Sequence, residues 1–508
     1  MRKRYNDLTY HVREAKLMAD IWSFLQSQHL VPHLLKGYFG LESEQHRLTA
    51  TGQLSRAPYP STFSSRQTNP YLKTDFADNM LEMVAPPSQG SRLAVRNLTM
   101  IQEVELAHLK NHDFLWPLSV PPVFSATDLH FAGQFNSRTW VAQYHDYLQA
   151  KYGTSRELLT GIHINFSFDR HLLTQLSAHL TSTTESAIAW QNQLYFQCAQ
   201  AFVAYRWLFT YLFGASPVAG NQLSGAPISF STPVRSLRNS NFGYTNFAEE
   251  TITYASLAAQ VRQLNAMLAN QRFFSLHEFY GLVRLKGRAT DLADLLANGI
   301  ERLEFRAFDL DPFAASGIAP TTLDFLELCL AYWLVTRPTL DLTTARERNH
   351  AVAMQDPTEV FAWVQREGGQ LVAQLREFAQ TIKAPAAYFH ALATVQQRLQ
   401  APTKTPSGRL VQFITSDHQL LNFGITTGQR RYQLFAQDPA PVPVLAETYS
   451  VQEQRLLQAA IELGLSISFT PALQISYHHQ SLSLTPTEPL IPSDITARQF
   501  LCRYFALE

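Results

Sequence analysis

The sequence predicts a mixed fold of helices and strands, in the α+β class, and two patterns of hydrophobicity predict it. Three short segments alternate polar and apolar residues with the period of a strand, namely 39–50, 161–168 and 300–313. Longer segments repeat apolar residues with the spacing of helices, namely 190–213, 250–270 and 320–400. No motif recurs every 20 to 50 residues, so a solenoid or a propeller is not expected.

The other segments complete this prediction. Residues 9–36 are expected to form one or two helices, and 74–84 is expected to form a helix that Thr74 or Asp75 caps. A further helix is expected near 450–464, with short strands after it. Segments rich in Pro, Gly or Ser are expected to be loops or linkers, namely 50–70, 400–409 and 437–446. A domain boundary is predicted near residue 440.

The composition indicates a large folded protein without an excess of either charge. Of its 508 residues, 46% are hydrophobic and 12% aromatic, which is ample for a packed core and excludes general disorder. Lys and Arg number 41, as do Asp and Glu. A nucleic-acid-binding protein usually carries a basic excess, so this class is not expected. Any chemistry that depends on charge must come from local clusters.

Cysteine usage and the apolar segments predict a cytoplasmic protein. Cys198, Cys329 and Cys502 are far apart and fit no metal-binding spacing, which is typical of thiols in a reducing compartment. Charged residues interrupt the N-terminal segment, which has no signal-peptide core and resembles an amphipathic helix. The most apolar stretch, 201–220, contains Arg206 and is predicted to be a buried helix rather than a membrane span.

Common nucleotide-binding and hydrolase motifs are absent from the sequence: G-x-x-x-x-G-K-[ST], G-x-G-x-x-G, H-E-x-x-H and G-x-S-x-G. The predicted strands instead carry polar pairs at period two: Glu42 with Glu44, His163 with Asn165, and Glu304 with Arg306. Asp75 and Glu82 would share one face of the helix predicted at 74–84. Taken singly, each pair has an ordinary explanation, such as a solvated strand face, a core histidine or a surface salt bridge.

If these elements face one cavity, their carboxylates repel each other. Glu42 and Glu44 would lie about 7 Å apart, which costs on the order of 2 kcal/mol at an effective dielectric constant near 20. Cations would have to supply the missing charge, and carboxylates with an occasional imidazole suit Mg²⁺ or Mn²⁺ better than Zn²⁺. Several such ions usually hold phosphates. Three arginines could clamp a phosphate or a substrate carboxylate as well: Arg238, Arg284 and Arg306.

An ordered series of sequence blocks resembles the glutamate–cysteine ligases, also called γ-glutamylcysteine synthetases. The blocks are GLESEQHRL (40–48), LKTDFADNMLEMV (72–84), WPLSVPP (116–122), KYG (151–153), GIHINFSF (161–168), YLFGASP (211–217), FGYTN (242–246), FYGLVRLKG (279–287) and GIERLEFRAFDLDPF (299–313). Their order and spacing agree over roughly residues 35–320, which is far more specific than any single block. Residues 449–469 also resemble the stretch that joins the ligase module to the ATP-grasp module in bifunctional glutathione-synthesising enzymes.

The resemblance implies a glutamine-synthetase-like fold, in which a curved, mostly antiparallel sheet forms a funnel flanked by helices. It implies a catalytic domain over 1–440 and a tail over 441–508 that resembles the linker to a second module, which this chain is expected to lack. The implied reaction uses ATP and Mg²⁺ to convert the γ-carboxylate of glutamate into γ-glutamyl phosphate, which the amine of cysteine then attacks. This is the first step of glutathione biosynthesis, and a monomer or homodimer is expected to perform it.

The resemblance also assigns roles to individual residues. The metal ligands that it implies are Glu42, Glu44, Asp75, Glu82, His163 and Glu304. Arg306 is implied to contact the transferred phosphate, with Arg284 as a helper. The positions implied to line the amino-acid pockets are Phe76, His145, Glu157, Arg238, Tyr244 and Tyr280. Because such catalysis depends on positioning and charge neutralisation, no nucleophilic side chain is required.

Three positions depart from the pattern of the family. His145 stands where relatives can carry an arginine that binds a substrate carboxylate, and Glu157 stands where an uncharged polar side chain can meet cysteine. Ile164 replaces a common tyrosine. The metal and phosphate residues are therefore complete, whereas the acceptor pocket is altered. Two alternatives to glutamate–cysteine ligase activity remain: a γ-glutamyl ligase for a different amine, and a catalytically degenerate paralogue that binds glutamate or nucleotide as a regulator.

Overall fold

The protein is built around one antiparallel β-sheet. The computed structural model describes residues 16–122, 124–132, 139–181, 185–217, 232–289, 291–338, 340–414, 420–470, 472–484 and 491–507. Six strands follow the order β2-β3-β1-β6-β8-β7, and β4 and β5 also pair with β1. The strands are β1 (Tyr38–Leu48), β2 (Leu72–Thr74), β3 (Met80–Val84), β4 (Ser88–Gln89), β5 (Phe114–Leu115), β6 (Ile162–Ser167), β7 (Val283–Lys286) and β8 (Arg302–Phe308).

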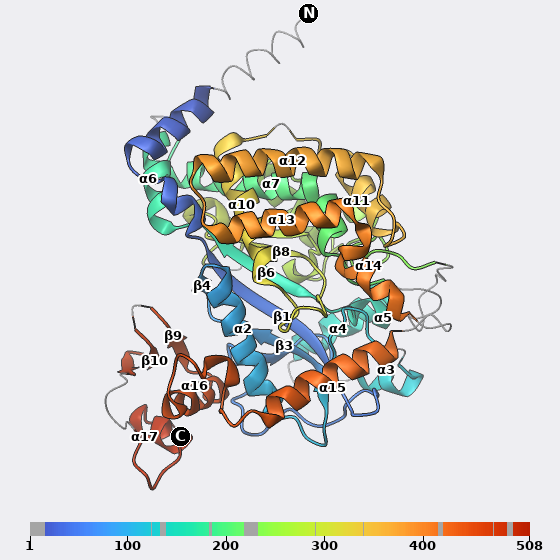
Figure 1. Cartoon of the computed structure of the whole chain (residues 1–508), viewed down its shortest axis with the longest axis vertical. Helices are drawn as coiled ribbons and strands as arrows, with labels where there is room; N and C mark the ends of the chain where they lie inside the picture. Colours follow the sequence, from blue (N-terminus) through green and yellow to red (C-terminus); the bar gives the residue numbers. More distant parts are fainter. Residues whose placement is uncertain are drawn as a thin grey trace, which may run out of the picture.

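A layer of helices covers one face of this sheet (Figure 1). The long helix α7 (Ala187–Phe213) packs on β8, α10 (Pro320–Thr336) packs beside α7, and α12 (Ala362–Thr381) and α13 (Ala386–Gln400) pack in turn on α10. The further helices of this part of the chain are α2 (Ser91–Leu106), α3 (Ala126–Ala132), α4 (Thr139–Tyr152), α5 (Thr154–Glu157), α6 (Arg170–Leu180), α8 (Leu257–Ala269), α9 (Leu292–Asn298), α11 (Ala345–Ala353) and α14 (Pro406–Leu410). Within the described residues, no helix has both the length and the apolar character needed to cross a membrane.

The three central strands bury every second side chain against the helices. Leu41 on β1, Ile164 on β6 and Phe305 on β8 are fully buried and belong to one core cluster. The Phe305 ring lies 4.7 Å from the ring of Phe202 on α7. Because side chains alternate along a strand, the residues between them point to the opposite face. The strands and the long helices predicted around these positions are confirmed, and they leave a polar sheet face for a site.

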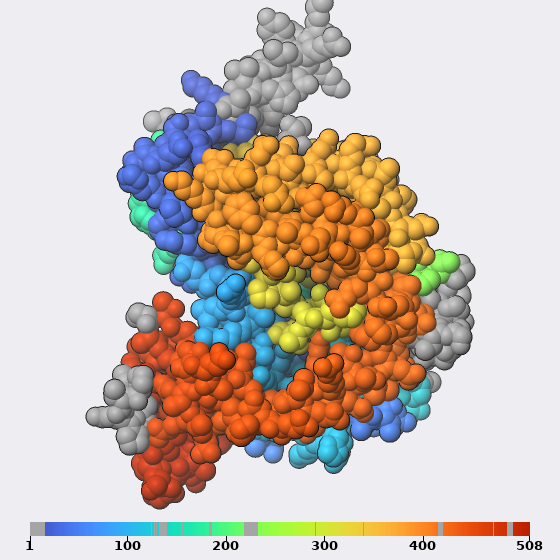
Figure 2. All heavy atoms as spheres, in the orientation of Figure 1, coloured from blue at the N-terminus to red at the C-terminus, as the bar shows by residue number. Residues whose placement is uncertain are grey.

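The C-terminal part of the chain lies against α2, on the other flank of the sheet. It contains α15 (Leu421–Gln437), η6 (Pro443–Leu445), α16 (Val451–Leu463), β9 (Ser466–Ser468), β10 (Gln474–Tyr477), β11 (Gln480–Ser483) and α17 (Ala497–Tyr504). Leu456 and Ile475 share a core cluster with Met100 and Val104 of α2. Figure 2 shows the part of the chain after α15, in red, as a lobe beside the blue surface of α2. The boundary predicted near residue 440 falls between α15 and η6.

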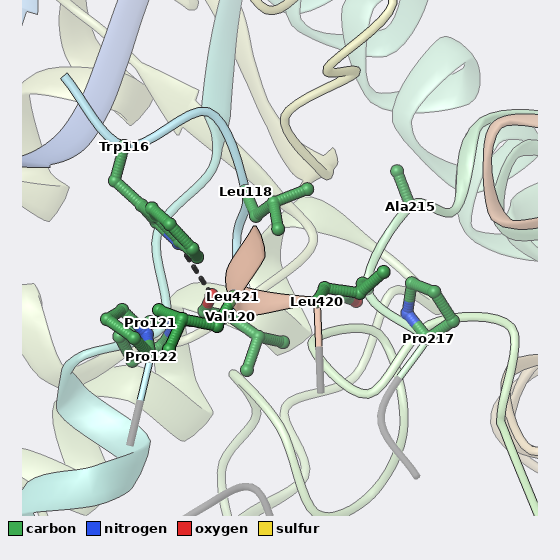
Figure 3. Close-up of a pocket in the computed structure, with 10 residues that line it drawn as sticks. Trp116, Leu118, Val120, Pro121, Pro122, Ala215, Pro217, Leu420 and Leu421 are labelled. Carbon is green, nitrogen blue, oxygen red and sulfur yellow. Dashed lines mark hydrogen bonds between the residues drawn. The ribbon is translucent and has the colours of Figure 1, made fainter. Parts of the chain in front are cut away.

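The start of α15 docks on the segment that follows β5 (Figure 3). The indole N–H of Trp116 donates a hydrogen bond to the carbonyl of Val120 over 2.8 Å, which fixes the ring beside Leu420 and Leu421. Together these residues surround a small cavity of about 30 Å³. Its lining carries neither an acid nor a base, so this cavity is a packing feature and offers no charged group for chemistry.

The helix predicted at 74–84 is wrong, because this segment forms the hairpin of β2 and β3. The backbone N–H of Asp75 donates to the carbonyl of Met80, which closes the turn between the two strands. β3 then pairs with β1, and Glu44 lies directly opposite Glu82. The apolar residues Met80, Leu81 and Met83 fit a helix as well as a strand by spacing, and the partner strand decides the outcome.

Two other predictions for the chain need adjustment. Residues 400–409, expected to be a linker, form η4 (Pro402–Lys404) and α14, and Ser407 is fully buried there. The helix expected at 250–270 is confirmed only over α8. Residues 16–27 are helical, and η1 (Val31–Leu35) follows them, whereas the start of the helix expected at 9–36 lies outside the described residues. The loop at 50–70, the helix near 450–464 and the late short strands are confirmed.

Candidate active site

The polar face of the sheet lines a cavity of about 550 Å³. Thirteen of the fourteen side chains to which the sequence assigned a role line it: Glu42, Glu44, Asp75, Phe76, Glu82, His145, Glu157, His163, Tyr244, Tyr280, Arg284, Glu304 and Arg306. They come from five strands, from the turn between β2 and β3, from α4 and α5, and from the loops before β7. The structure therefore brings together residues that are as far as 264 positions apart in the sequence (Glu42 to Arg306).

Strand pairing explains why these side chains meet. Glu82 lies opposite Glu44, and Glu42, on the same face of β1, lies opposite His163. The next pairs continue the row across the sheet, since Asn165 lies opposite Glu304 and Glu304 opposite Arg284. Directly opposed residues of neighbouring strands have their Cβ atoms about 5 Å apart. The acids Glu82, Glu44, Glu42 and Glu304 therefore form a row from β3 to β8. The row ends beside the basic side chain of Arg284 on β7.

Glu42, His163 and Glu304 form the tightest group of metal-ligand types among the described residues. One ligand atom from each lies within 4.8 Å of the others. The Nδ1 of His163 lies 3.2 Å from Glu42, and the side-chain amide of Asn165 donates to Glu42 over 2.8 Å. Burial lowers the pKa of His163 to about 4, because desolvation penalises the imidazolium. The imidazole is therefore neutral near pH 7, which is the form that binds metals.

Glu44 on β1 and Glu82 on β3 lie in surroundings that disfavour their ionised forms. Burial raises the pKa of Glu44 well above its usual value, and Asp75 adds to this by repulsion. Burial also raises the pKa of Glu82 to about 8, with contributions from Glu42 and Asp75. Both shifts disfavour the ionised form, and with a pKa of about 8 Glu82 holds a proton at pH 7 unless a cation enters.

Glu304 has the opposite environment, because basic side chains surround it. The Nη1 of Arg306 lies 3.3 Å from one carboxylate oxygen and the Nζ of Lys286 2.5 Å from the other, while Arg284 lies 3.9 Å away. Burial alone would raise the pKa of Glu304, but these three cations hold it below its usual value. The sequence analysis missed Lys286, although its spacing of two from Arg284 on β7 places both on one strand face.

Aromatic side chains form the remaining wall of the cavity. The ring of His145 lies 4.8 Å from Phe76, and burial lowers the pKa of His145, which disfavours the charged form of the imidazole. The Tyr280 hydroxyl donates to Glu157 over 3.0 Å, and the rings of Tyr280 and Tyr244 lie 4.4 Å apart. The sequence analysis also missed several lining residues: Lys73 on the short strand β2, Trp140, Tyr144 and Leu148 on α4, and His277 in the segment before β7.

Arg238 is the predicted site residue that does not line the cavity. It is 2% exposed and donates a hydrogen bond of 2.7 Å to the backbone carbonyl of Arg306. Its guanidinium lies 5.3 Å from the centre of the Tyr244 ring and fills the space beside Gly161, where a Cβ would collide with it. Arg238 therefore supports Arg306 and Tyr244 from behind the cavity wall.

Comparison with known proteins identifies the family of this chain. The sequence model of the glutamate-cysteine ligase family matches residues 22–275 and 260–354. The chain belongs to this family. It is 33% identical over 450 residues to the glutathione biosynthesis bifunctional protein of Streptococcus agalactiae, a match that covers 87% of this chain and 58% of that protein. The protein of the same description from Pasteurella multocida is 33% identical over 393 residues, which cover 76% of this chain and 51% of the relative.

Solved structures resemble the fold of this glutamate–cysteine ligase family member. The bifunctional glutathione synthetase from Pasteurella multocida superposes with a TM-score of 0.83 at 29% identity, over 90% of this chain and 61% of that one. The glutamate–cysteine ligase of Francisella tularensis in complex with AMP has a TM-score of 0.69 at 22% identity, over 84% of this chain and 94% of that one, and it shows a shared fold. The family resemblance and the α+β fold with an antiparallel sheet are thereby confirmed. The chain spans just over half the length of the curated relatives that it matches.

The three departures from the family pattern lie in different surroundings. His145 and Glu157 line the cavity, whereas Ile164 is fully buried on the helix-facing side of β6. The prediction that Ile164 alters the acceptor pocket is therefore wrong, because alternation along β6 turns residue 164 away from the cavity that His163 faces.

Proposed function

We propose that this chain is an ATP-dependent glutamate–cysteine ligase, which joins the γ-carboxylate of glutamate to the amine of cysteine in the first step of glutathione biosynthesis. The proposal rests on one observation: in a member of this family, nearly all of the residues that the resemblance singles out line a single cavity. The cavity juxtaposes a group of acids with a group of cations, and a reaction that moves a phosphoryl group needs both.

The donor set fits Mg²⁺ or Mn²⁺. Glu42, Glu304 and the neutral His163 offer hard oxygen atoms and one imidazole within a small volume. Glu44, Asp75 and Glu82 extend this set toward β3 and the turn before it. The Nε2 of His163 has no hydrogen-bond partner among the described residues and lies 3.4 Å from a carboxylate oxygen of Glu44, so an ion here would have both atoms as ligands. When bound, such ions would neutralise these acids and the phosphates of ATP.

The basic side chains are proposed to act on the transferred phosphate. Arg306 and Arg284, with Lys286 beside them, present a fixed positive group next to Glu304. They would stabilise the charge that develops as the γ-carboxylate of glutamate takes the phosphoryl group of ATP. The amine of cysteine then attacks γ-glutamyl phosphate, and phosphate leaves. Positioning and charge stabilisation suffice for both steps, so the protein supplies no nucleophile.

The finer description of the fold belongs to this proposal. A funnel of the glutamine-synthetase type would place the nucleotide phosphates over the polar sheet face and the two amino acids against its aromatic wall. The covering of only one sheet face by α7 and α10 supports this arrangement, since it leaves the other face for substrates. The cytoplasmic location and the division near residue 440 stay predictions.

The test measures ADP release with glutamate, ATP and Mg²⁺, with cysteine and with a panel of other amines, and identifies each product by mass spectrometry. We expect cysteine-dependent turnover that yields γ-glutamylcysteine. The variants Glu42→Gln and Glu304→Gln should lose at least about 100-fold in rate, by analogy with the loss of one preorganised charge contact. Glu377→Gln, which changes an exposed acid on α12, is the matched control.

Three other results would each contradict one part of the proposal: the acceptor, the catalytic activity or the metal ligands. Turnover with a different amine alone would keep the ligase chemistry and reject cysteine as the acceptor. Tight binding of Mg-ATP without turnover would support a regulator that has lost catalysis. Normal turnover in Glu42→Gln or Glu304→Gln would reject the metal assignment.

A further inference from the structure

A buried group of charges lies near the C-terminal end of α4, behind the cavity wall. The Nζ of Lys151 lies 2.8 Å from a carboxylate oxygen of Glu250 and 2.5 Å from one of Glu278. These two glutamates are 2% and 0% exposed. Lys151 also donates a hydrogen bond of 2.7 Å to the backbone carbonyl of Arg272. None of these four residues lines the cavity, and none takes part in the reaction proposed above.

The carboxylate of Glu278 joins α4 to the chain segment 272–280. Its Oε1 accepts hydrogen bonds from Lys151 and from the hydroxyls of Tyr147, over 3.2 Å, and Tyr152, over 3.0 Å. Its Oε2 accepts the backbone N–H of Phe274 over 2.6 Å. Desolvation alone would lower the pKa of Lys151, but its hydrogen bonds to the two glutamates raise it above the usual value, so the ammonium group stays charged.

Asn246 connects this group of charges to the tyrosines of the cavity wall. Its side-chain amide donates to the backbone carbonyl of Glu278 over 2.8 Å and to the hydroxyl of Tyr152 over 3.1 Å. Its Oδ1 accepts the backbone N–H of Tyr280 over 2.9 Å. Tyr244 lies two positions earlier in the chain than Asn246. The segments that carry both wall tyrosines are therefore attached to the same group.

Helix α4 supplies another part of the same wall. Tyr144 and Leu148 of this helix line the cavity and share an apolar cluster with Tyr280. Apolar contacts of this kind do not account for the charges behind them, since replacing a buried ion pair by apolar side chains is often neutral or stabilising. A buried polar network whose members are all hydrogen-bonded instead makes its surroundings rigid. Stability alone therefore does not explain why Lys151 and its two glutamates lie here.

We propose that Lys151 is a positioning residue, which fixes α4 against the segment 272–280 and thereby sets the spacing of the aromatic wall. This inference rests on the proposed ligase function, in which the amino-acid substrates lie against that wall. Lys151 itself contacts no substrate. The ATP phosphates belong to the charged part of the cavity around Glu304, which the group at Lys151 does not contact. Loss of Lys151 should therefore impair the use of the amino acids and spare the binding of ATP.

The experiment measures kcat and the three KM values, for cysteine, glutamate and ATP, in the unmodified protein and in Lys151→Met. A small misplacement of a binding wall can cost far more than its size suggests, so we expect the KM for at least one amino acid to rise at least about tenfold. The KM for ATP should stay within about twofold. Lys151→Arg keeps the charge and should stay within about threefold of the unmodified protein in every KM.

Urea unfolding of the same variants, followed by circular dichroism, separates positioning from a structural role. The matched control is Arg348→Met, which breaks an ion pair of 2.5 Å with Glu367 on the helices α11 and α12, away from the cavity. It should lower the unfolding midpoint and leave all three KM values unchanged. The double variant Lys151→Met/Glu278→Gln should lose less in kcat/KM than the product of its two single losses, because both changes break the same contact.

The outcomes separate this inference from the function on which it rests. A folded Lys151→Met variant with unchanged KM values would overturn the inference and leave the ligase proposal intact, whatever its unfolding midpoint. A parallel rise in the KM for all three substrates would overturn it as well, because it would show general loosening. Absence of turnover in the unmodified protein would overturn both.

A second variant decides the matter if Lys151→Met does not fold. Glu278→Gln is nearly isosteric and keeps an acceptor oxygen for the N–H of Phe274, but it removes the charge that Lys151 faces. It should raise the KM for the same amino acid at least about threefold and leave the KM for ATP unchanged. Unchanged KM values for both amino acids in folded Glu278→Gln would overturn the inference.

Discussion

Replacing Arg306 by methionine should destabilise the protein even without substrates. The side chain is 7% exposed, its Nη1 lies 3.3 Å from Glu304, and it also bonds to the hydroxyl of Tyr244. At this separation and an effective dielectric constant of 20, the attraction between the two charges amounts to about 5 kcal/mol. Removing one partner of a buried ion pair typically costs about 3–5 kcal/mol, because the other charge stays buried.

The environment of Glu304 places the expected loss near the lower end of this range. Lys286 and Arg284 still neutralise part of the carboxylate when Arg306 is absent. We therefore expect Arg306→Met to lower the free energy of unfolding by about 3 kcal/mol. Arg306→Lys keeps the charge but loses the planar fork that reaches Glu304 and Tyr244 together, so it should cost about 1–2 kcal/mol.

Urea unfolding in the presence of EDTA, followed by circular dichroism, measures these losses without bound metal. The double variant Glu304→Gln/Arg306→Met completes a thermodynamic cycle and should lose less than the sum of its single variants. An unfolding midpoint of Arg306→Met equal to that of the unmodified protein would refute the reasoning. Additive losses in the cycle would show that the two side chains do not interact, whatever their distance.

Three further predictions concern protonation and packing. Burial and neighbouring acids raise the pKa of Glu82 to about 8, so Mg²⁺ titration at pH 7 should release about one proton. Calorimetry in buffers of different ionisation enthalpy measures the number of protons released. A titration that releases no proton would contradict this prediction. Burial raises the pKa of Glu327 to about 7, above its unfolded value, so its contribution to stability is greatest below pH 4.5 and is lost as pH rises through 7. Glu327→Gln should remove this fall in the free energy of unfolding, which amounts to up to about 3 kcal/mol. Stability curves against pH that run parallel for both proteins would refute this prediction. A Cβ on Gly424 would collide with Trp116, so Gly424→Ala should lower the free energy of unfolding by about 1–3 kcal/mol, as measured by thermal unfolding. The control Gly369→Ala, at a helix position with open space, should leave it unchanged or raise it by up to about 1 kcal/mol.

The sequence could predict those strands and helices whose spacing of polar and apolar residues fits only one type of secondary structure. Along β6 and β8 polar and apolar residues alternate in the sequence, so periodicity identified these strands, although both of their faces are largely buried. The hairpin at 74–84 could not be found in this way. Met80, Leu81 and Met83 satisfy a helical spacing as well, and only pairing with β1, more than 30 residues earlier in the chain, selects the strand.

The candidate site was predictable in its members but not in its arrangement. Periodicity and the family resemblance singled out Glu42, His163 and Glu304, yet their meeting depends on the strand order β1-β6-β8, which no local pattern encodes. Lys286 could have been found, since it alternates with Arg284. Tyr144 and Leu148 could not, because aromatic and apolar residues on a helix predict burial and say nothing of a cavity.

The cavity combines two electrostatic environments that need each other. Around Glu304, cations are in excess, and the pKa of the acid is lowered; around Glu44 and Glu82, acids are in excess, and their pKa values are raised. Neither arrangement maximises the stability of the empty protein, since cations lie close together on one side and acids with disfavoured ionised forms on the other. A ligand that is itself divided, with phosphate oxygens toward the arginines and divalent cations toward the acids, relieves both at once. On the proposed function, a bound metal–phosphate complex would therefore stabilise both sides of the cavity, which fits the occurrence of both signs on one strand, as in Glu304 and Arg306.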